Sequence, residues 1–123
     1  MQNDRVKFKK EFKSRLYVFV LQLIQIIEAL PKDRTCYILG DQLLRSGTSI
    51  IGNYIEGQSA SSKRDFIKYF DSSLKSANES KLWIALLRDS HKISRLTSEK
   101  LLKELVEISN IFGASLLTLK NKT

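Results

Sequence analysis

The sequence has few of the residues that interrupt helices and few that bind metals. Its 123 residues include one proline, five glycines, one cysteine and one histidine. So few turn-forming residues favour long helices over many short strands. The single cysteine cannot form a disulfide within the chain. One histidine (His91) and one cysteine (Cys36) give neither a zinc site nor a Cys–His pair, and no ExxH pair indicates a di-iron bundle. We therefore expect no enzyme activity, no metal and no cofactor.

Long apolar runs are also missing. The most apolar segment, residues 16–30, has fifteen residues and contains Gln22, Gln25 and Glu28, whereas a membrane-spanning helix needs about 20. No small-residue cleavage site follows it, so the pattern does not predict a signal peptide. We expect a cytoplasmic protein without a membrane partner, folded as one domain over residues 1–123.

Apolar residues recur at spacings of three and four along the chain, as in the buried face of a bundle helix. Four such segments joined by short loops predict an all-α, antiparallel up-down-up-down four-helix bundle. In the first segment, Val20, Ile24 and Ile27 add a second apolar row, which suggests contact with a second partner. The helices are expected at about residues 5–30, 34–56, 62–89 and 98–120.

Candidate start and stop signals flank these segments. Pro31 ends the first, because the residue before a proline avoids helical geometry. Asp33 or Thr35 can cap the second. Ser62, with an acidic residue three positions later, has the capping-box pattern for the third. Thr97 is the expected cap of the fourth.

The stretch RSGTSIIGNYIEG, residues 45–57, raises the question of a phosphate-binding loop. No lysine follows Gly52, as a P-loop would require, and no strand precedes the stretch. Its apolar residues instead continue the helical spacing of the second segment. We therefore expect Gly47 and Gly52 to allow close helix packing and Gly57 to end the helix in a left-handed conformation.

A stripe of polar and small residues runs beside the apolar face of this segment. It consists of Arg45, Ser49, Gly52, Asn53 and Glu56. The stripe is either a solvated face or a contact in which Arg45 and Glu56 find charged partners on another helix or subunit. Within the chain, Glu79 and Lys81 are possible partners.

The chain carries a formal charge of +8 at pH 7, which favours RNA, DNA or an anionic membrane surface as a partner. In an antiparallel bundle, residues 1–15, 56–68 and 118–123 share one end, here called the basic end. It holds eleven Lys/Arg against four Asp/Glu, Arg15 and Lys122 included. Tyr17, Tyr54 and Tyr69 are weaker candidates for stacking on bases. The candidate nucleic-acid-binding residues are Lys9, Lys10, Lys13, Lys63, Arg64 and Lys68.

The densest sequence patterns are LRSGTSIIGNYIEG at 44–57 and SKRDFIKYFDSSLKSANESKLWIALLRD at 62–89. They resemble the four-helix-bundle family typified by 23S rRNA intervening-sequence proteins, with one departure, Ile51-Gly52 where a Gly-Ala or Ala-Ala pair is usual. The matching motif positions are Arg45, Ser49, Ile50, Asn53, Glu56, Gly57, Ser62, Lys63, Phe66 and Glu79. Of these, we expect Arg45, Ser49, Asn53, Glu56, Gly57, Phe66 and Glu79 to serve assembly.

The resemblance implies a small four-helix bundle that assembles into a ring-like homopentamer with a basic surface or channel. A related member, the accessory variability determinant of diversity-generating retroelements, works with a reverse transcriptase and binds nucleic acid.

Three functional hypotheses follow. The first is a non-enzymatic homo-oligomer that binds the RNA or DNA backbone. The second is a protein-interaction scaffold or accessory subunit of a nucleic-acid enzyme such as a reverse transcriptase. The third, an enzyme acting on nucleic acid, has no acid–base or metal constellation to support it.

Overall fold

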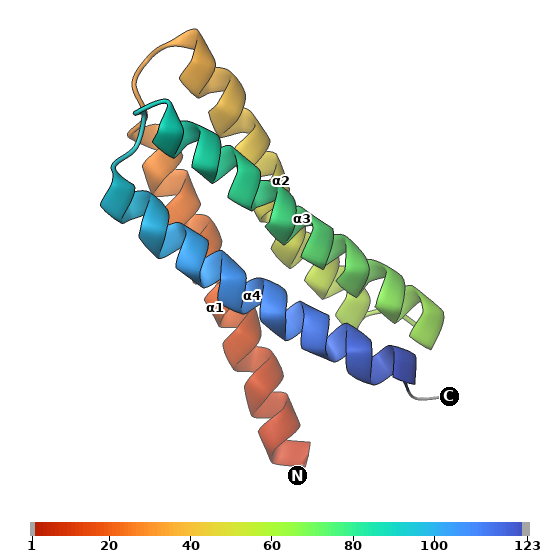
Figure 1. The fold of residues 1–123 in the computed structure, drawn as a ribbon. Coiled ribbons are helices and arrows are strands. Elements are labelled where there is room, and N and C mark those ends of the chain that lie inside the picture. Colours follow the sequence, from red (N-terminus) through yellow and green to blue (C-terminus); the bar gives the residue numbers. More distant parts are fainter. Residues whose placement is uncertain (1, 122–123) are drawn as a thin grey trace.

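The computed structural model describes residues 2–121, which form four long helices joined by short loops (Figure 1). No strand occurs within this range. Successive helices run in opposite directions, so the expected all-α fold with four antiparallel helices is confirmed. None of the helices in the described range is both long and apolar enough to cross a membrane. The helices are α1 (Gln2–Glu28), α2 (Arg34–Gln58), α3 (Lys63–Asp89) and α4 (Arg95–Asn121).

The ends of the helices follow local hydrogen bonding. The Asp33 side chain accepts from the backbone N–H of Cys36 at 2.8 Å, and Ser62 Oγ accepts from the N–H of Asp65 at 3.1 Å. These caps were expected from the sequence. Helix α1 ends at Glu28, two residues earlier than expected, because the chain turns before Pro31.

The expected cap of the fourth helix was wrong. Helix α4 begins at Arg95, and Ser94 Oγ accepts from the backbone N–H of Thr97 at 3.1 Å. Thr97 therefore lies in the first turn rather than before it. Ser94 is the better cap because its side chain precedes the first free N–H groups of the helix.

The role expected for Gly57 was also wrong. None of the glycines among residues 2–121 has a positive φ, and α2 continues through Gly57 to Gln58. Gly57 is buried, and a Cβ added there would lie 3.0 Å from Phe70 Cδ1. Its lack of a side chain thus makes room for an aromatic ring of α3.

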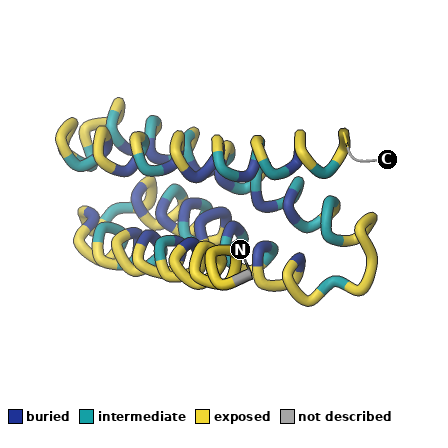
Figure 2. Tube along the Cα trace, turned by 90° about the horizontal axis from the view of Figure 1, so that it is seen from below, coloured by how far each residue is buried: buried dark blue, intermediate teal, exposed yellow. Residues whose placement is uncertain are grey.

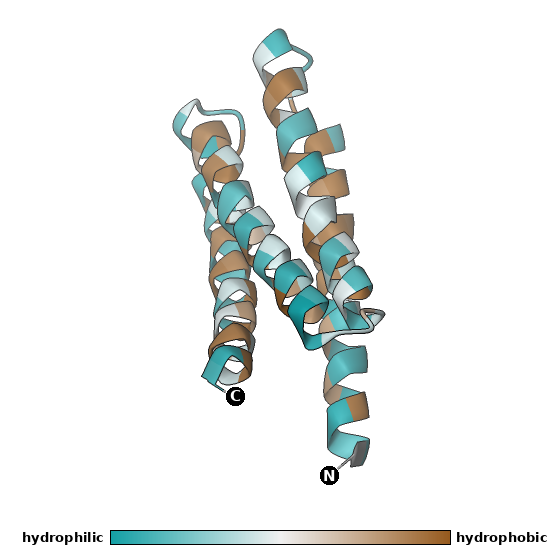
Figure 3. Ribbon diagram, turned by 90° about the vertical axis from the view of Figure 1, so that its right-hand side faces the viewer, coloured by the Kyte–Doolittle hydropathy of each residue, from teal (hydrophilic) through white to brown (hydrophobic). Residues whose placement is uncertain are grey.

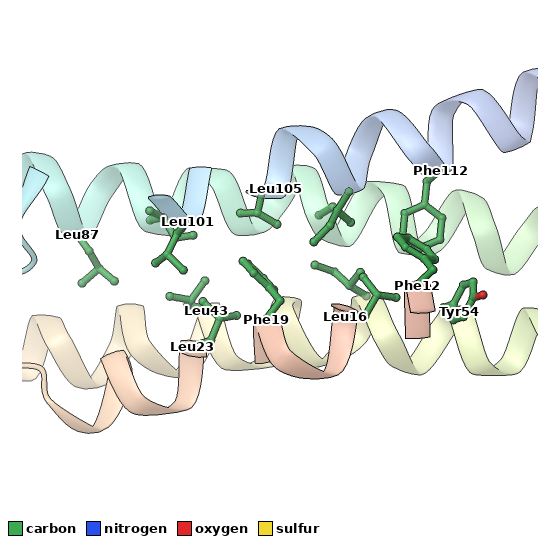
Figure 4. Packing of buried hydrophobic residues seen from close by; sticks show 14 of the residues in the cluster. Phe12, Leu16, Phe19, Leu23, Leu43, Tyr54, Leu87, Leu101, Leu105 and Phe112 are labelled. Carbon is green, nitrogen blue, oxygen red and sulfur yellow. The ribbon is translucent and has the colours of Figure 1, made fainter. Parts of the chain in front are cut away.

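The apolar faces of the four helices meet in a continuous core (Figure 4). The α1 residues Phe12, Leu16, Phe19 and Leu23 are all at most 4% exposed. They face the inward sides of α2, α3 and α4, while each helix keeps exposed residues on its outer side (Figure 2). The second apolar row on α1 is half-buried within the same chain.

Small residues line the interface between α2 and α3. Ser46 and Ser80, both fully buried, are joined by a hydrogen bond of 2.7 Å between their hydroxyls. The buried Ser73 donates to the carbonyl of Ile50 at 2.9 Å. Because serine side chains are short, the two helices approach closely, and the crossing hydrogen bonds satisfy the buried hydroxyls.

The first turns of α1 extend past the rest of the bundle. Residues 3–10 are all exposed, and they form a largely hydrophilic end below the other helices in Figure 3. Core packing on α1 begins at Phe12, which is 4% exposed. The projecting turns carry Lys7, Lys9 and Lys10 at the basic end.

Candidate nucleic-acid interface

All four helices contribute to one recess at the basic end. The start of α1, the end of α2, the start of α3 and the end of α4 meet there, as the antiparallel topology requires. The lining is mostly apolar and includes aromatic rings from three helices. We call it the aromatic recess; its residues are Phe8, Lys9, Phe12, Tyr54, Gln58, Phe66, Phe70, Ile111, Ala114, Ser115, Thr118 and Leu119.

The three predicted lysines of α1 lie on different sides of that helix. Lys9 lines the aromatic recess. Lys10 and Lys13 lie beside Tyr17 and Val18 along a shallow depression on the outer surface. All three lysines are exposed, so α1 presents positive charge both into the recess and away from it.

The other three predicted residues occupy the first two turns of α3, where Lys63, Arg64 and Lys68 are exposed. The Lys68 ammonium lies 5.7 Å from the centre of the Tyr69 ring. Within residues 2–121, Lys9, Lys10, Lys13 and Arg64 have no carboxylate at ion-pair distance. Their charge is therefore not neutralised within the described chain. Lys122, also counted at this end, lies outside the described residues.

The charge of Arg15, unlike that of these four residues, is neutralised by carboxylates of the same chain. Its guanidinium donates to Glu104 on α4 at 2.7 and 2.8 Å and also pairs with Glu107. The hydrogen bonds to Glu104, followed by the negative charge of Glu104 and the interactions with Glu107, raise the pKa of Arg15. Arg15 thus joins α1 to α4, and the sequence-based count overstated the free charge of the basic end.

The aromatic rings at this end form a continuous chain of contacts from α1 to α3. Phe8 stacks on Phe12 with ring centres 6.0 Å apart. Phe12 makes edge contacts with Tyr54 at 5.1 Å and Phe112 at 5.3 Å. Phe112 contacts Phe70 at 5.3 Å, and Phe70 in turn stacks on Phe66 at 4.2 Å. Buried rings therefore hold in place the two that lie at the rim, Phe8 and Phe66.

The structure separates the three tyrosines proposed for stacking. Tyr54 is 3% exposed, and burial raises the pKa of its hydroxyl. Its ring packs in the core at the base of the aromatic recess and is not an exposed stacking surface. Tyr17 is 59% exposed on the outer face of α1, and Tyr69 lies beside Gly57.

The polar stripe of α2 makes one of its two expected charged contacts. Arg45 pairs with Glu79 of α3 and also donates to Gln42 Oε1 at 2.8 Å. Glu79 accepts a second hydrogen bond, from Trp83 Nε1 at 2.9 Å. The Arg45–Glu79 pair, one of the alternatives left open by the sequence, therefore links α2 to α3. Lys81, the other candidate, donates to Asn78 instead.

The remaining stripe residues bond within α2 or face solvent. Ser49 Oγ donates to the Arg45 carbonyl, and Asn53 Nδ2 donates to the Ser49 carbonyl, both at 2.8 Å. Glu56 is exposed and has no ion pair within residues 2–121. Gly52 is exposed, and a Cβ added there would meet nothing within 4 Å. The expectation that Gly52 allows close helix packing was therefore wrong for helices of the same chain.

The lone cysteine and histidine lie apart from this end. Cys36 is buried, and burial raises the pKa of its thiol, which is the environment of an unreactive cysteine. His91 follows α3 with φ of 63°. Among the described residues, no three His, Cys, Asp or Glu side chains are grouped so as to hold a metal ion.

Two features of the site were missed from the sequence. The Arg15 ion pairs depend on the rotation of α1 against α4, which periodicity does not give. The aromatic recess had a visible signal, since Phe8, Phe12, Tyr54 and Phe66 lie near the helix ends that an antiparallel bundle brings together. The prediction for this end rested on its lysines and arginines, with Tyr54 as a weaker candidate for stacking, and Phe8 was given no role.

Comparisons with known proteins agree with this architecture. Residues 9–114 match the family model described as 23S rRNA-intervening sequence protein. The fold is similar to a crystal structure of a protein of unknown function from the S23 ribosomal protein family of Bacteroides thetaiotaomicron. The two share 30% identity and a TM-score of 0.80, over 85% of this chain and 96% of the other. A comparison with curated proteins found no match.

Proposed function

Because this chain belongs to the family of 23S rRNA-intervening sequence proteins, we propose that it binds the phosphate backbone of RNA or DNA through the basic end. The observation that carries the proposal is the set of exposed cations there. Lys9, Lys10, Lys13 and Arg64 have no carboxylate partner within residues 2–121. The protein acts in this role as a binding module and not as an enzyme.

Phosphate contacts have a characteristic signature. Each phosphate neutralised by a lysine or arginine releases counterions, so the affinity falls steeply as salt rises. Contacts to the backbone fix the position of a protein but carry no sequence information. We therefore expect strong salt dependence and weak sequence preference.

The test reverses charge at Lys63 and Arg64, which are exposed in the first turn of α3. Fluorescence polarisation measures the affinity of K63E/R64E for a labelled 20-nucleotide RNA and for the same sequence as DNA. We expect weaker binding and a salt slope lower by about one for each phosphate that is no longer neutralised. The matched control, K32E/R34E, reverses two exposed cations at the opposite end of the bundle.

Unchanged affinity of K63E/R64E would remove Lys63 and Arg64 from the proposed interface. The alternative function, a scaffold for an acidic protein partner, is distinguished by purifying the protein from cells with and without nuclease. Co-purifying material that nuclease digests supports the present proposal. A stoichiometric protein that survives nuclease supports the alternative.

We also propose that the chain forms a homo-oligomer through the groove between α1 and α4, as a ring of five in line with the family resemblance. The groove runs along residues 11–26 of α1 and residues 97–104 of α4. Most of its lining residues are polar, and the apolar ones are Val18, Phe19, Ile26 and Leu101. Beside it, Tyr17, Val18 and Leu21 are between 45% and 59% exposed. Apolar surface of this kind on a bundle helix is typical of a protein–protein contact.

Sedimentation velocity tests the assembly. Val18 on α1 and Leu82 on α3 are both 51% exposed, so they form a matched pair for substitution by glutamate. V18E should reduce the particle to single chains of 14.1 kDa, while L82E should leave the assembly intact. Assembly that persists in V18E would exclude this groove as the contact.

A further inference from the structure

The aromatic recess opens in the middle of the basic end. Lys9 is part of its lining, and Leu119, another lining residue, is followed directly by Lys120. On α3, Lys63 lies one helical turn before Phe66. A surface that recognises phosphates alone needs only the cations. An apolar, aromatic recess between them is therefore a separate feature that calls for its own explanation.

Each of the two rings at the rim packs on a buried ring. Phe8 is 53% exposed, and its ring is nearly parallel to that of the buried Phe12, with an interplanar angle of 14°. On the other side, the half-buried Phe66 stacks on the buried Phe70 at 30°. A ring that already packs on a neighbour loses less conformational entropy than a free ring when a flat ligand stacks on it.

We propose that the aromatic recess receives an unpaired base of a single-stranded RNA or DNA whose phosphates lie on the surrounding lysines. The proposal rests on the proposed function and adds the class of nucleic acid. Bases in a duplex are already paired and stacked, whereas an unpaired base offers its face to an aromatic side chain. A second copy fits less well, because it would bring another basic end against this one.

The experiment compares three ligands of equal length at one salt concentration: a labelled 20-nucleotide single strand, the same sequence as a duplex, and an abasic strand with the same phosphates. The wild-type protein should bind the single strand more tightly than either of the others. F8A should weaken binding to the single strand by about fivefold or more, the size of one lost base stack. Its affinity for the abasic strand should not change.

The matched control is V6A, because Val6 is 65% exposed on the same helix and does not line the recess. Circular dichroism checks that both variants remain folded. A 2-aminopurine base in the single strand gives a second readout, since its fluorescence is quenched by stacking and should recover in F8A.

The outcomes separate this inference from the proposed function. Equal affinity for all three ligands, or equal effects of F8A and V6A, would overturn the inference and leave backbone binding in place. Failure to bind any of the ligands at low salt would overturn both. If F8A leaves single-strand binding intact and instead dissociates the protein's own oligomer in sedimentation, a second copy covers the recess and the inference is wrong.

Discussion

Leu23 of α1 occupies the space that a side chain at position 47 of α2 would need. A Cβ added to Gly47 would lie 2.3 Å from Leu23 Cδ1, and Leu23 is fully buried. The expectation that Gly47 allows close helix packing is thus confirmed. The φ of Gly47 is in the ordinary negative range, which any residue can adopt. Glycine is therefore required here by the neighbouring helix and not by the backbone conformation.

Replacing Gly47 by alanine should destabilise the protein. Alanine favours a helix by about 1 kcal/mol over glycine, but forcing a methyl group against Leu23 costs about 1–3 kcal/mol. We expect G47A to lower the free energy of unfolding by up to about 2 kcal/mol in urea titrations, because the clash outweighs the gain in helix propensity.

Gly52, little more than one turn later on α2, provides the control. No atom lies within 4 Å of a Cβ added there, so G52A should raise the free energy of unfolding by about 0.5–1 kcal/mol. If G47A raises the free energy of unfolding as G52A does, helix propensity, and not the contact with Leu23, dominates at position 47.

The Arg45–Glu79 pair should contribute little to the stability of a single chain. The Arg45 side chain is 57% exposed, and exposed ion pairs are worth about 0.2–1 kcal/mol. A double-mutant cycle with R45M, E79Q and the double variant measures the coupling energy. A coupling above about 2 kcal/mol would mean that the pair is shielded from solvent.

The choice of E79Q isolates the charge of Glu79 from its other hydrogen bond. The amide oxygen that this substitution introduces can still accept from Trp83, the only tryptophan of the chain. E79A removes that acceptor as well, so it should also alter the tryptophan emission spectrum.

Replacing His91 by glycine should stabilise the protein. The N–H of His91 donates to the Arg88 carbonyl at 3.0 Å and that of Lys92 to the Leu87 carbonyl at 2.8 Å, which is the Schellman pattern at a helix C-terminus. His91 holds the left-handed position at φ of 63°, where a side chain is unfavourable. We expect H91G to raise the melting temperature, with a gain of about 0.5–1 kcal/mol. S90G, at a residue with φ of −89°, should lower it.

Asp33 should make stability depend on pH in the acid range. The backbone N–H of Cys36, followed by the Lys92 side chain at 3.0 Å, lowers the pKa of Asp33 below its ordinary value. A lowered pKa in the folded state contributes stability above the unfolded pKa of about 3.9, and that stability is lost as the pH falls through the folded pKa.

The variant D33N keeps a capping side chain and removes the charge. Its urea midpoint should be below that of the wild type at pH 6, and the difference should shrink at pH 3. D41N, at an exposed position inside α2, should show no such narrowing. A constant difference for D33N at both pH values would indicate that the carboxylate gains nothing from its charge.

Much of the fold could be predicted from the sequence because it depends on local patterns. The apolar spacing on α3, for example, places Phe70, Ala77, Ile84 and Leu87 in the core, and all are at most 5% exposed. The Ser62 cap could be predicted for the same reason, since it needs only residues three apart. Thr97 was predicted as the cap that Ser94 in fact provides, because both residue types suit that position and the sequence does not rank them.

The site was less predictable because it depends on how helices rotate about their axes. Periodicity places Arg15 on the flank of α1 but does not say that Glu104 lies opposite it. Gly47 and Gly52 look alike in the sequence, yet of these two only Gly47 faces another helix of the same chain. The binding role of the six predicted cations stays a prediction.

The projecting start of α1 should respond to heating differently from the rest of the bundle. Residues 3–10 are all exposed. Apart from the stacking of Phe8 on Phe12, they depend mainly on hydrogen bonds within the helix, and a helical segment of this length is marginal in water. Heating should uncoil these turns well before the bundle melts from Phe12 onward. Lys7, Lys9 and Lys10 are on the part that uncoils first. The protein can therefore change the arrangement of its charges at a temperature at which its core is still intact.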